Sequence, residues 1–335
     1  MRFFNLFLGF LGLGSDVITV TTGTAGAPGS TAADFVNYIT AQMLEVAELR
    51  TVLDQFGQKQ GLPSNNSKTV QFVREEKLVV ASTPTQLVEG QMPDAEAITI
   101  NQFTATTEQY GNVVRISDLA ELTAKHDVVQ RTMYMLALQV AETYDQLIFT
   151  VLDAATNSYR PNNRTSDTTV LGTDHVAYND LISNAAKLFD AGGRPFADGS
   201  FVFVCAPQVK ATLLKDPDFK ASVQFAKPES IWRGEIANLG GFRIVQSNAP
   251  AFAVTAVSTS GRADKIYSSF GIGQYAYQIT DLQNARMYSE GPGGPSDVLQ
   301  QNRKMGWKFA FKTLITNQSW IRRFRSAGLD SVTNP

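Results

Sequence analysis

Residue types that perform chemistry occur in this chain, but not at the spacing that chemistry requires. The two histidines, His126 and His175, are far apart in sequence, and neither has a second ligand at metal-binding spacing, so each is interpreted as a surface or capping side chain. The single cysteine, Cys205, lies in an apolar run, which predicts a buried, inert thiol and excludes a disulfide within the chain. The chain has no phosphate-binding loop and no metalloprotease, dithiol or serine-hydrolase motif. We therefore expect no catalytic residue, no metal site and no cofactor.

One glycine motif resembles a dinucleotide-binding fingerprint. Gly271–Ala276 fits the GxGxxA pattern after a predicted strand, and Glu290 follows about twenty residues later, as that fold requires. The fingerprint also needs a helix whose N-terminus meets the pyrophosphate, whereas Tyr275–Thr280 alternates like a strand. The pattern favours a connection between two strands, and a nucleotide-binding oxidoreductase is kept as an alternative function.

Charged residues gather in two places. A cluster of carboxylates lies in and beside a predicted hairpin arm: Glu75, Glu76, Glu89, Asp94 and Glu96. Paired acids catalyse reactions only in a pocket that shifts their pKa values, so on an exposed arm we interpret them as solvated or as partners for a neighbour's cations. Near the C-terminus Arg322, Arg323 and Arg325 surround Phe324, a pattern consistent with nucleic-acid contact and with contact between subunits.

The amino-acid composition is typical of a folded globular protein. The chain has 335 residues, 43% of them hydrophobic and 18% charged, and a formal charge of −2. That charge does not support a broad cationic surface that wraps nucleic acid. Residues 1–14 are apolar behind Arg2, which is typical of a signal peptide and would make a secreted binding module a second alternative. We favour an apolar arm in which Phe3, Phe4 and Phe7 contact another subunit.

A long helix is predicted to be the spine of the fold. Asp127–Ala155 contains neither glycine nor proline, and its apolar residues recur at three- and four-residue spacing. Asp127 is a candidate N-cap. At about 1.5 Å per residue the helix would be about 43 Å long, and its polar side excludes a membrane span.

A long hairpin arm precedes this helix. Lys68–Val80 and Ala97–Ser117 alternate like strands, and the segment between them is longer than an ordinary connection. An arm of that shape cannot bury both faces on its own body, so we expect it to lie on another chain. The residues predicted to contact the neighbour are Pro84, Leu87, Val88, Glu89 and Met92, together with Arg322 and Arg323.

The remaining segments mix helices and strands without a repeated strand–helix–strand order, which indicates the α+β class. We expect helices over Asp34–Gln55 and Asp180–Asp190 and at Pro207, and strands over Ser200–Cys205, Phe242–Val245 and Lys265–Phe270. The last stretch, Trp307–Arg325, is expected to alternate like a strand, to turn near Asn317 and to resume at Trp320.

Several short motifs occur in the order of a known family. They are Gly14–Thr19, Leu87–Pro93, Gln109–Gly111 with Ile116–Asp118, Ala141–Asp145, Gly234–Gly241 and Gly306–Lys308. In this order the chain resembles the major capsid protein of tailed bacteriophages with the Hong Kong 97-type fold, and more narrowly the family typified by the capsid protein of phage N4.

The resemblance implies a division of the chain and a set of partners. Residues 1–67 would be an N-terminal arm, 68–117 the extended loop over an adjacent subunit, 118–174 and 291–335 the peripheral domain, and 175–290 the axial domain. The protein would form hexamers and pentamers of an icosahedral head around double-stranded DNA. It would assemble in the host cytoplasm without a membrane and meet scaffolding, portal and decoration proteins, with only weak, non-specific DNA contact.

Overall fold

The computed structural model describes most of the chain from Thr51 onward. The described residues are 51–62, 67–76, 89–90, 92, 97–125, 127–220, 240–247, 253–255, 263, 265–291 and 299–331. The chain divides into two compact units. One contains Asn112–Leu138 and Met287–Trp307, and the other contains Gln139–Arg286, Lys308–Pro335 and the segment that ends at Gly111.

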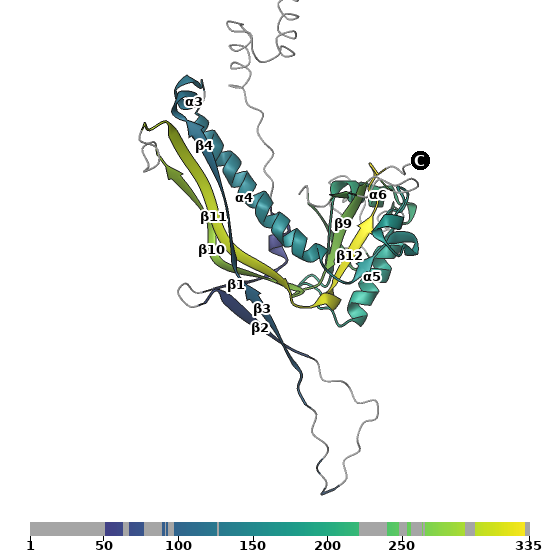
Figure 1. Ribbon diagram of the computed structural model, residues 1–335. Coiled ribbons are helices and arrows are strands. Elements are labelled where there is room, and N and C mark those ends of the chain that lie inside the picture. The colour runs from purple at the N-terminus through teal and green to yellow at the C-terminus, as the bar shows by residue number, and fades with distance from the viewer. Residues whose placement is uncertain are drawn as a thin grey trace, which may run out of the picture. The chain divides into compact units, whose positions relative to one another are not determined.

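Among the described helices the longest is α4 (Val128–Asp153), which contributes residues to both units (Figure 1). It begins where the sequence predicts, because the Asp127 carboxylate accepts the backbone N–H groups of Val129 at 3.0 Å and Gln130 at 3.1 Å. The predicted apolar stripe is the packed one, since Leu136, Ile148 and Leu152 are buried. The prediction of a spine helix is confirmed.

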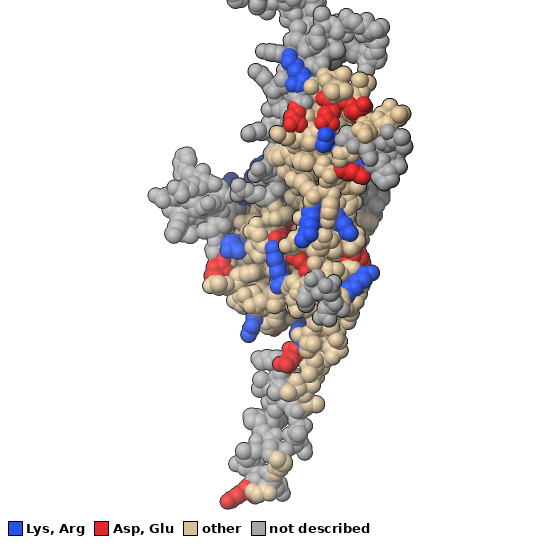
Figure 2. Space-filling model, turned by 90° about the vertical axis from the view of Figure 1, so that its left-hand side faces the viewer, with Lys and Arg blue, Asp and Glu red and all other residues tan. Residues whose placement is uncertain are grey.

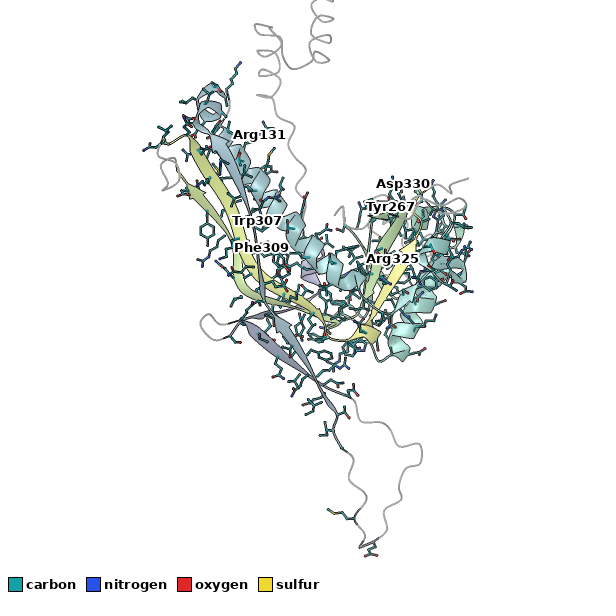
Figure 3. The ribbon with its side chains drawn as sticks, in the orientation of Figure 1. Arg131, Tyr267, Trp307, Phe309, Arg325 and Asp330 are labelled. Carbon is teal, nitrogen blue, oxygen red and sulfur yellow. The ribbon has the colours of Figure 1, made fainter. Side chains whose placement is uncertain are left out.

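The larger sheet lies in the second unit and has the order β5–β12–β9–β6–β7, with β8 paired to β9. Its strands are β5 (Ser158–Tyr159), β6 (Phe201–Cys205), β7 (Phe242–Gln246), β8 (Ala253–Thr255), β9 (Lys265–Ile272) and β12 (Ile321–Ser326). Side chains alternate along β9, so Phe270 meets Phe149 of α4 at 5.3 Å between ring centroids, whereas Gly271 faces the ring of Phe242. The Tyr267 hydroxyl points to Asp330 and donates to it at 2.8 Å, which fixes the C-terminal segment (Figure 3).

The described residues of the second unit also include the helices α5 (Tyr178–Asp190) and α6 (Pro207–Lys215). Leu181, Ala185 and Leu188 recur at helical spacing and are buried, so α5 turns one face to the core. Pro207 occupies the first turn of α6, which lies on the connection between the parallel strands β6 and β7. This single strand–helix–strand crossover sits in a sheet whose other long pairings are antiparallel, and the α+β class is confirmed.

A second sheet has the order β1–β10–β11–β4. Its strands are β1 (Gln58–Gly61), β10 (Tyr277–Glu290), β11 (Asn302–Ile315) and β4 (Glu108–Ser117). Aromatic rings pack at its centre: Tyr144 of α4 stacks on Phe311 at 4.5 Å, and Tyr110 lies 5.6 Å from Phe309. Short 3-10 helices complete the described elements: η1 (Leu53–Gln55), η2 (Pro161–Asn163), η3 (Asp167–Thr169) and η5 (Gln318–Trp320).

The first unit holds a short helix, α3 (Asp118–Thr123), with its leucines turned outward. Ser117 Oγ caps it by accepting the N–H of Ala120 at 3.3 Å, and Glu121 pairs with Arg303 through contacts of 3.1 and 3.2 Å. These polar attachments leave Leu119 67% and Leu122 82% exposed. The two leucines of this helix therefore contribute apolar surface to the exposed face of the first unit.

The predicted hairpin arm differs from the structure in one respect. Its second strand was expected to run over Ala97–Ser117, but it divides at Thr107 into β3 (Ile100–Thr106) and β4, and only β3 pairs with β2 (Thr69–Glu75). The branch point is fixed because Thr107 donates its backbone N–H at 3.0 Å and its hydroxyl at 2.9 Å to the carbonyl of Lys68. The predicted helix over Asp34–Gln55 lies outside the described residues except at its end, which contains η1.

Candidate assembly surface

The hairpin is built on a two-residue alternation. Strands β2 and β3 are antiparallel, with Phe72 opposite Phe103. Val70, Phe72 and Ala105 are buried together, and Leu62, Phe103 and Leu314 pack against them. Alternation places these side chains on one face of the hairpin and leaves the other face free.

Arg74 fixes the base of the hairpin to the second unit. Its Nη1 donates to the carbonyl of Thr316 at 2.7 Å, and its Nη2 donates to Glu76 at 3.2 Å. The guanidinium also lies over the Phe103 ring, 5.4 Å from the centroid. The hairpin is therefore held at its base by its own unit.

The opposite face of the hairpin and the segment beyond it expose apolar side chains. Val73 is 59% exposed, Ile100 52%, Ile98 65% and Met92 96%. Gly90 adopts φ +81°, a conformation that favours glycine and suits a turn at the tip. Single exposed apolar residues are common, but a series along one arm indicates a surface that associates with another molecule.

The described residues include part of the predicted contact set. Glu89 and Met92 are both exposed. Phe3, Phe4, Phe7, Pro84, Leu87 and Val88 lie outside the described residues. Sequence reasoning did not select Val73, Ile98 or Ile100, although Val73 gives a signal, since it is apolar and out of phase with the buried Val70 and Phe72.

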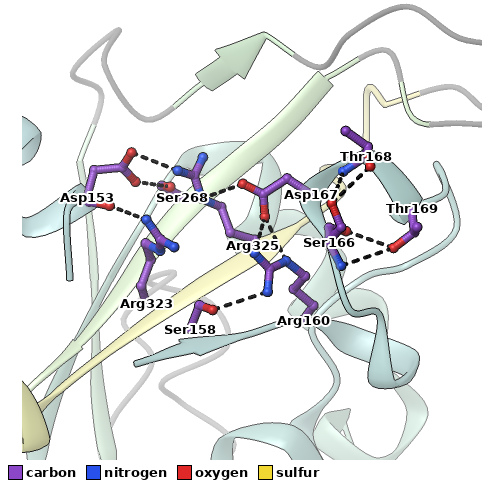
Figure 4. A network of polar contacts seen from close by, with 10 residues as sticks. All are labelled: Asp153, Ser158, Arg160, Ser166, Asp167, Thr168, Thr169, Ser268, Arg323 and Arg325. Atoms are coloured by element: carbon purple, nitrogen blue, oxygen red, sulfur yellow. Dashed lines mark hydrogen bonds and ion pairs between the residues drawn. The ribbon is translucent and has the colours of Figure 1, made fainter. Parts of the chain in front are cut away.

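The predicted arginine cluster forms a polar network inside the second unit (Figure 4). Arg325 is only 5% exposed, and its Nη2 lies 2.7 Å from a carboxylate oxygen of Asp153, while its Nε lies 3.7 Å from Asp167. Arg323 donates to the backbone carbonyl of Asp153, and burial lowers its pKa, as it does that of Arg322. Arg325 thus joins the end of α4 to β12, and a contact of Arg322 and Arg323 with a neighbour stays a prediction.

Charges of both signs are interspersed on the face that Figure 2 shows, without a continuous basic area among the coloured residues. This agrees with the formal charge of −2 for the whole chain. Such a face lacks the continuous basic area that tight binding of nucleic acid uses.

The residues considered in the sequence as candidates for cofactor binding or catalysis contribute to packing and to connections within the fold. Gly271–Ala276 joins β9 to the strand β10 with no helix between them, which confirms the strand-to-strand interpretation and contradicts the dinucleotide fold. A Cβ on Gly271 would lie 3.0 Å from a ring carbon of Phe242, so this glycine allows close packing. Burial raises the pKa of the Cys205 thiol to about 12, and the Nδ1 atom of His175 lies 3.2 Å from the carbonyl of Ala327.

Two further observations concern metal ligands and membrane-spanning helices among the described residues. Within the described part of the chain, no group of three or more His, Cys, Asp or Glu side chains is arranged to hold a metal ion. No helix among the described residues is both long and apolar enough to cross a membrane. Residue His126 and the apolar residues 1–14 lie outside the described ranges.

Solved structures of phage shells are similar to this chain. The chain is similar to the capsid structure of cyanophage P-SCSP1u (16% identity, 91% of this chain and 93% of that chain, TM-score 0.62). It is also similar to the head structure of Helicobacter pylori bacteriophage KHP40 (11% identity, 85% of this chain and 94% of that chain, TM-score 0.62). A third similar structure is the capsid of Ralstonia phage GP4 (12% identity, 93% of this chain and 100% of that chain, TM-score 0.60). These similarities define the Hong Kong 97-type fold. No curated protein sequence matches the chain.

The family follows from the sequence itself. The model of the phage capsid protein family matches residues 100–316, which is more than half of the chain. The chain belongs to the phage capsid protein family. It is a structural major capsid protein.

Proposed function

We propose that copies of this capsid protein associate into hexamers and pentamers, which close into an icosahedral head around the double-stranded phage DNA. The observation that supports this most strongly is the hairpin, which is anchored at its base by Arg74 and exposes Met92 and Ile98 to 96% and 65%. Apolar side chains on an anchored arm gain stability when a neighbouring copy covers them.

The chain divides into parts with different roles in this proposal. Residues 68–117 are the extended loop over an adjacent copy, and residues 1–67 are an N-terminal arm. Residues 118–174 and 291–335 form a peripheral domain, and residues 175–290 form the axial domain near the centres of the capsomers. The exposed leucines of α3 support a second contact surface in the peripheral domain.

Each contact between copies should be individually modest. Stable interfaces bury roughly 1,200–2,000 Å² in total, and a shell subunit meets several neighbours. An arm adds contact area without enlarging the core, and several linked contacts raise the overall affinity. Weak single contacts also allow a wrongly placed copy to dissociate before the shell closes.

The proposal includes the surroundings of the shell. Assembly takes place in the host cytoplasm and the product is the capsid of the virion, with scaffolding, portal and decoration proteins as further partners. The near-neutral charge supports weak, non-specific contact with the packaged DNA.

Electron microscopy of the purified full chain, with sedimentation velocity, tests this function. We expect closed shells or rings of five and six copies that grow more abundant as the protein concentration rises. A folded protein that stays monomeric at all concentrations, with and without its co-expressed phage head proteins, would contradict the proposal.

A further inference from the structure

A small groove lies at the base of the hairpin. Its volume is about 160 Å³, and its lining includes Phe72, Val73, Arg74, Phe103, Tyr275 and Trp320. A cavity of about 150 Å³ lined by apolar side chains is known to accept a benzene molecule. The groove therefore has the size of one aromatic ring.

Several polar groups around the groove are already engaged, whereas the Oε1 atom of Gln278 is buried without a hydrogen-bond partner among the described residues. Arg74 donates to the Thr316 carbonyl at 2.7 Å, and the indole N–H of Trp320 donates to the Ala191 carbonyl at 3.4 Å. The Asn317 side chain accepts the N–H of Ser319 at 3.0 Å. What remains for a ligand is mainly the carbon surface of aromatic residues, which prefer other rings in offset or edge-to-face contact.

One segment of the chain matches this groove. Residues 1–14 carry four phenylalanines, Phe3, Phe4, Phe7 and Phe10, together with Arg2 and no acidic residue. The only charged side chain among the described residues of the groove lining is Arg74, and Glu76 already pairs with it at 3.2 Å, so the groove suits an uncharged side chain such as phenylalanine. Residues 15–50 separate this segment from the described chain and can span up to about 120 Å when extended, at about 3.3 Å per residue, so a neighbouring copy is within reach.

We propose that the groove binds a phenylalanine side chain from residues 1–14 of a second copy. The proposal rests on the shell function, because a contact within one chain would add nothing to association. Between copies it gives each hairpin base a partner arm and makes the exposed Val73 part of an interface.

Photo-cross-linking in assembled particles tests the proposal. Phe3, Phe4, Phe7 and Phe10 are replaced one at a time by p-benzoylphenylalanine in the full chain, and particles are formed from an equal mixture of ¹⁴N- and ¹⁵N-labelled chains. After irradiation, mass spectrometry should find at least one position linked to a peptide with Phe103, Tyr275 or Trp320, with about half of the links joining unlike isotopes. Links within one isotope only, or links to other surfaces, would overturn the proposal.

A matched pair of variants shows whether the groove is the site. Tyr275→Ala at the groove should lower the cross-link yield at least about fivefold, whereas Tyr134→Ala, at a similarly exposed position of the other unit, should leave it unchanged. Equal yields in the two variants, with circular dichroism showing both folded, would also overturn it. Particles that form without groove cross-links reject only this contact, whereas failure of the unmodified chain to form particles rejects the shell function as well.

Discussion

The Asp145 carboxylate accepts the backbone N–H of Leu53 at 2.9 Å, although the two residues lie 92 positions apart. The Tyr277 hydroxyl donates to the carbonyl of the same leucine, so both backbone groups of Leu53 are bound. Leu53 is fully buried and Asp145 is 3% exposed. These contacts fix Leu53 in the second unit.

Asp145 should make stability depend on pH. Burial raises its pKa from 3.8 to about 6, so the folded chain holds this proton more tightly than the unfolded chain. The free energy of unfolding should therefore fall by up to about 3 kcal/mol as pH rises from about 4 to 6. Asp145→Asn keeps an oxygen for Leu53 and should remove this part of the slope. Urea unfolding of the unassembled protein at several pH values measures it, and parallel profiles for the two proteins would contradict the assignment.

The buried ion pair between Arg325 and Asp153 should be costly to break. Arg325→Ala leaves the Asp153 carboxylate without its main cation, and the loss should be about 3 kcal/mol or more of unfolding free energy. The control is Arg303→Ala, because the pair of Arg303 with Glu121 is partly exposed and should contribute less than about 1 kcal/mol. Denaturant unfolding compares the two variants. Similar losses would mean that burial of Arg325 is unimportant.

Some parts of the fold could be predicted because the pattern specifies them locally. The spine helix follows from an N-cap at Asp127 and an apolar stripe without glycine or proline. The turn at Gly271–Ala276 was distinguished from a nucleotide fingerprint because the sequence after it alternates. In both cases the signal lies within a few residues.

Other parts of the fold could not be predicted from the sequence. The alternation of apolar and polar residues shows which face of a strand is buried, but it does not show which other strand pairs with it. The division of the second hairpin strand at Thr107 depends on the Lys68 carbonyl and on β11, which are distant in sequence. Burial of Arg325 depends on Asp153 and Asp167, and the sequence alone shows only a basic cluster. The groove at the hairpin base combines residues from four separate segments.

Leu136 should be essential for folding. It is 3% exposed, so Leu136→Asp would bury an unpaired carboxylate at a cost above about 4 kcal/mol. Met135→Asp is the matched control, because the adjacent Met135 is 45% exposed on the same helix. Circular dichroism and solubility should show loss of structure in the first variant alone. A folded, soluble Leu136→Asp protein would disprove the assignment of the packed helix face.

Gly271 should be required for packing. In Gly271→Ala the added Cβ would meet the rings of Phe242 at 3.0 Å and Phe324 at 3.3 Å, which should cost about 1–3 kcal/mol. Gly61→Ala, with nothing within 4 Å of its Cβ, should change stability by less than about 0.5 kcal/mol. Thermal unfolding distinguishes them, and equal midpoints would show that Gly271 is not tightly packed.

The hairpin is the feature on which the assembly account depends. Removal of Ser82–Pro93 leaves the buried face of β2 and β3 and the Arg74 anchor in place, so the subunit should fold normally. It should lose the apolar surface at Met92, which is 96% exposed. The deletion is therefore expected to leave the stability of the monomer unchanged and to lower the yield of shells.

The most direct measurement counts shells by electron microscopy for the full chain and for the chain without Ser82–Pro93, at equal concentration and with matching circular dichroism spectra. We expect abundant shells from the full chain and none from the shortened one. Shells of normal size and yield from the shortened chain would contradict the claim that the hairpin joins one copy to the next.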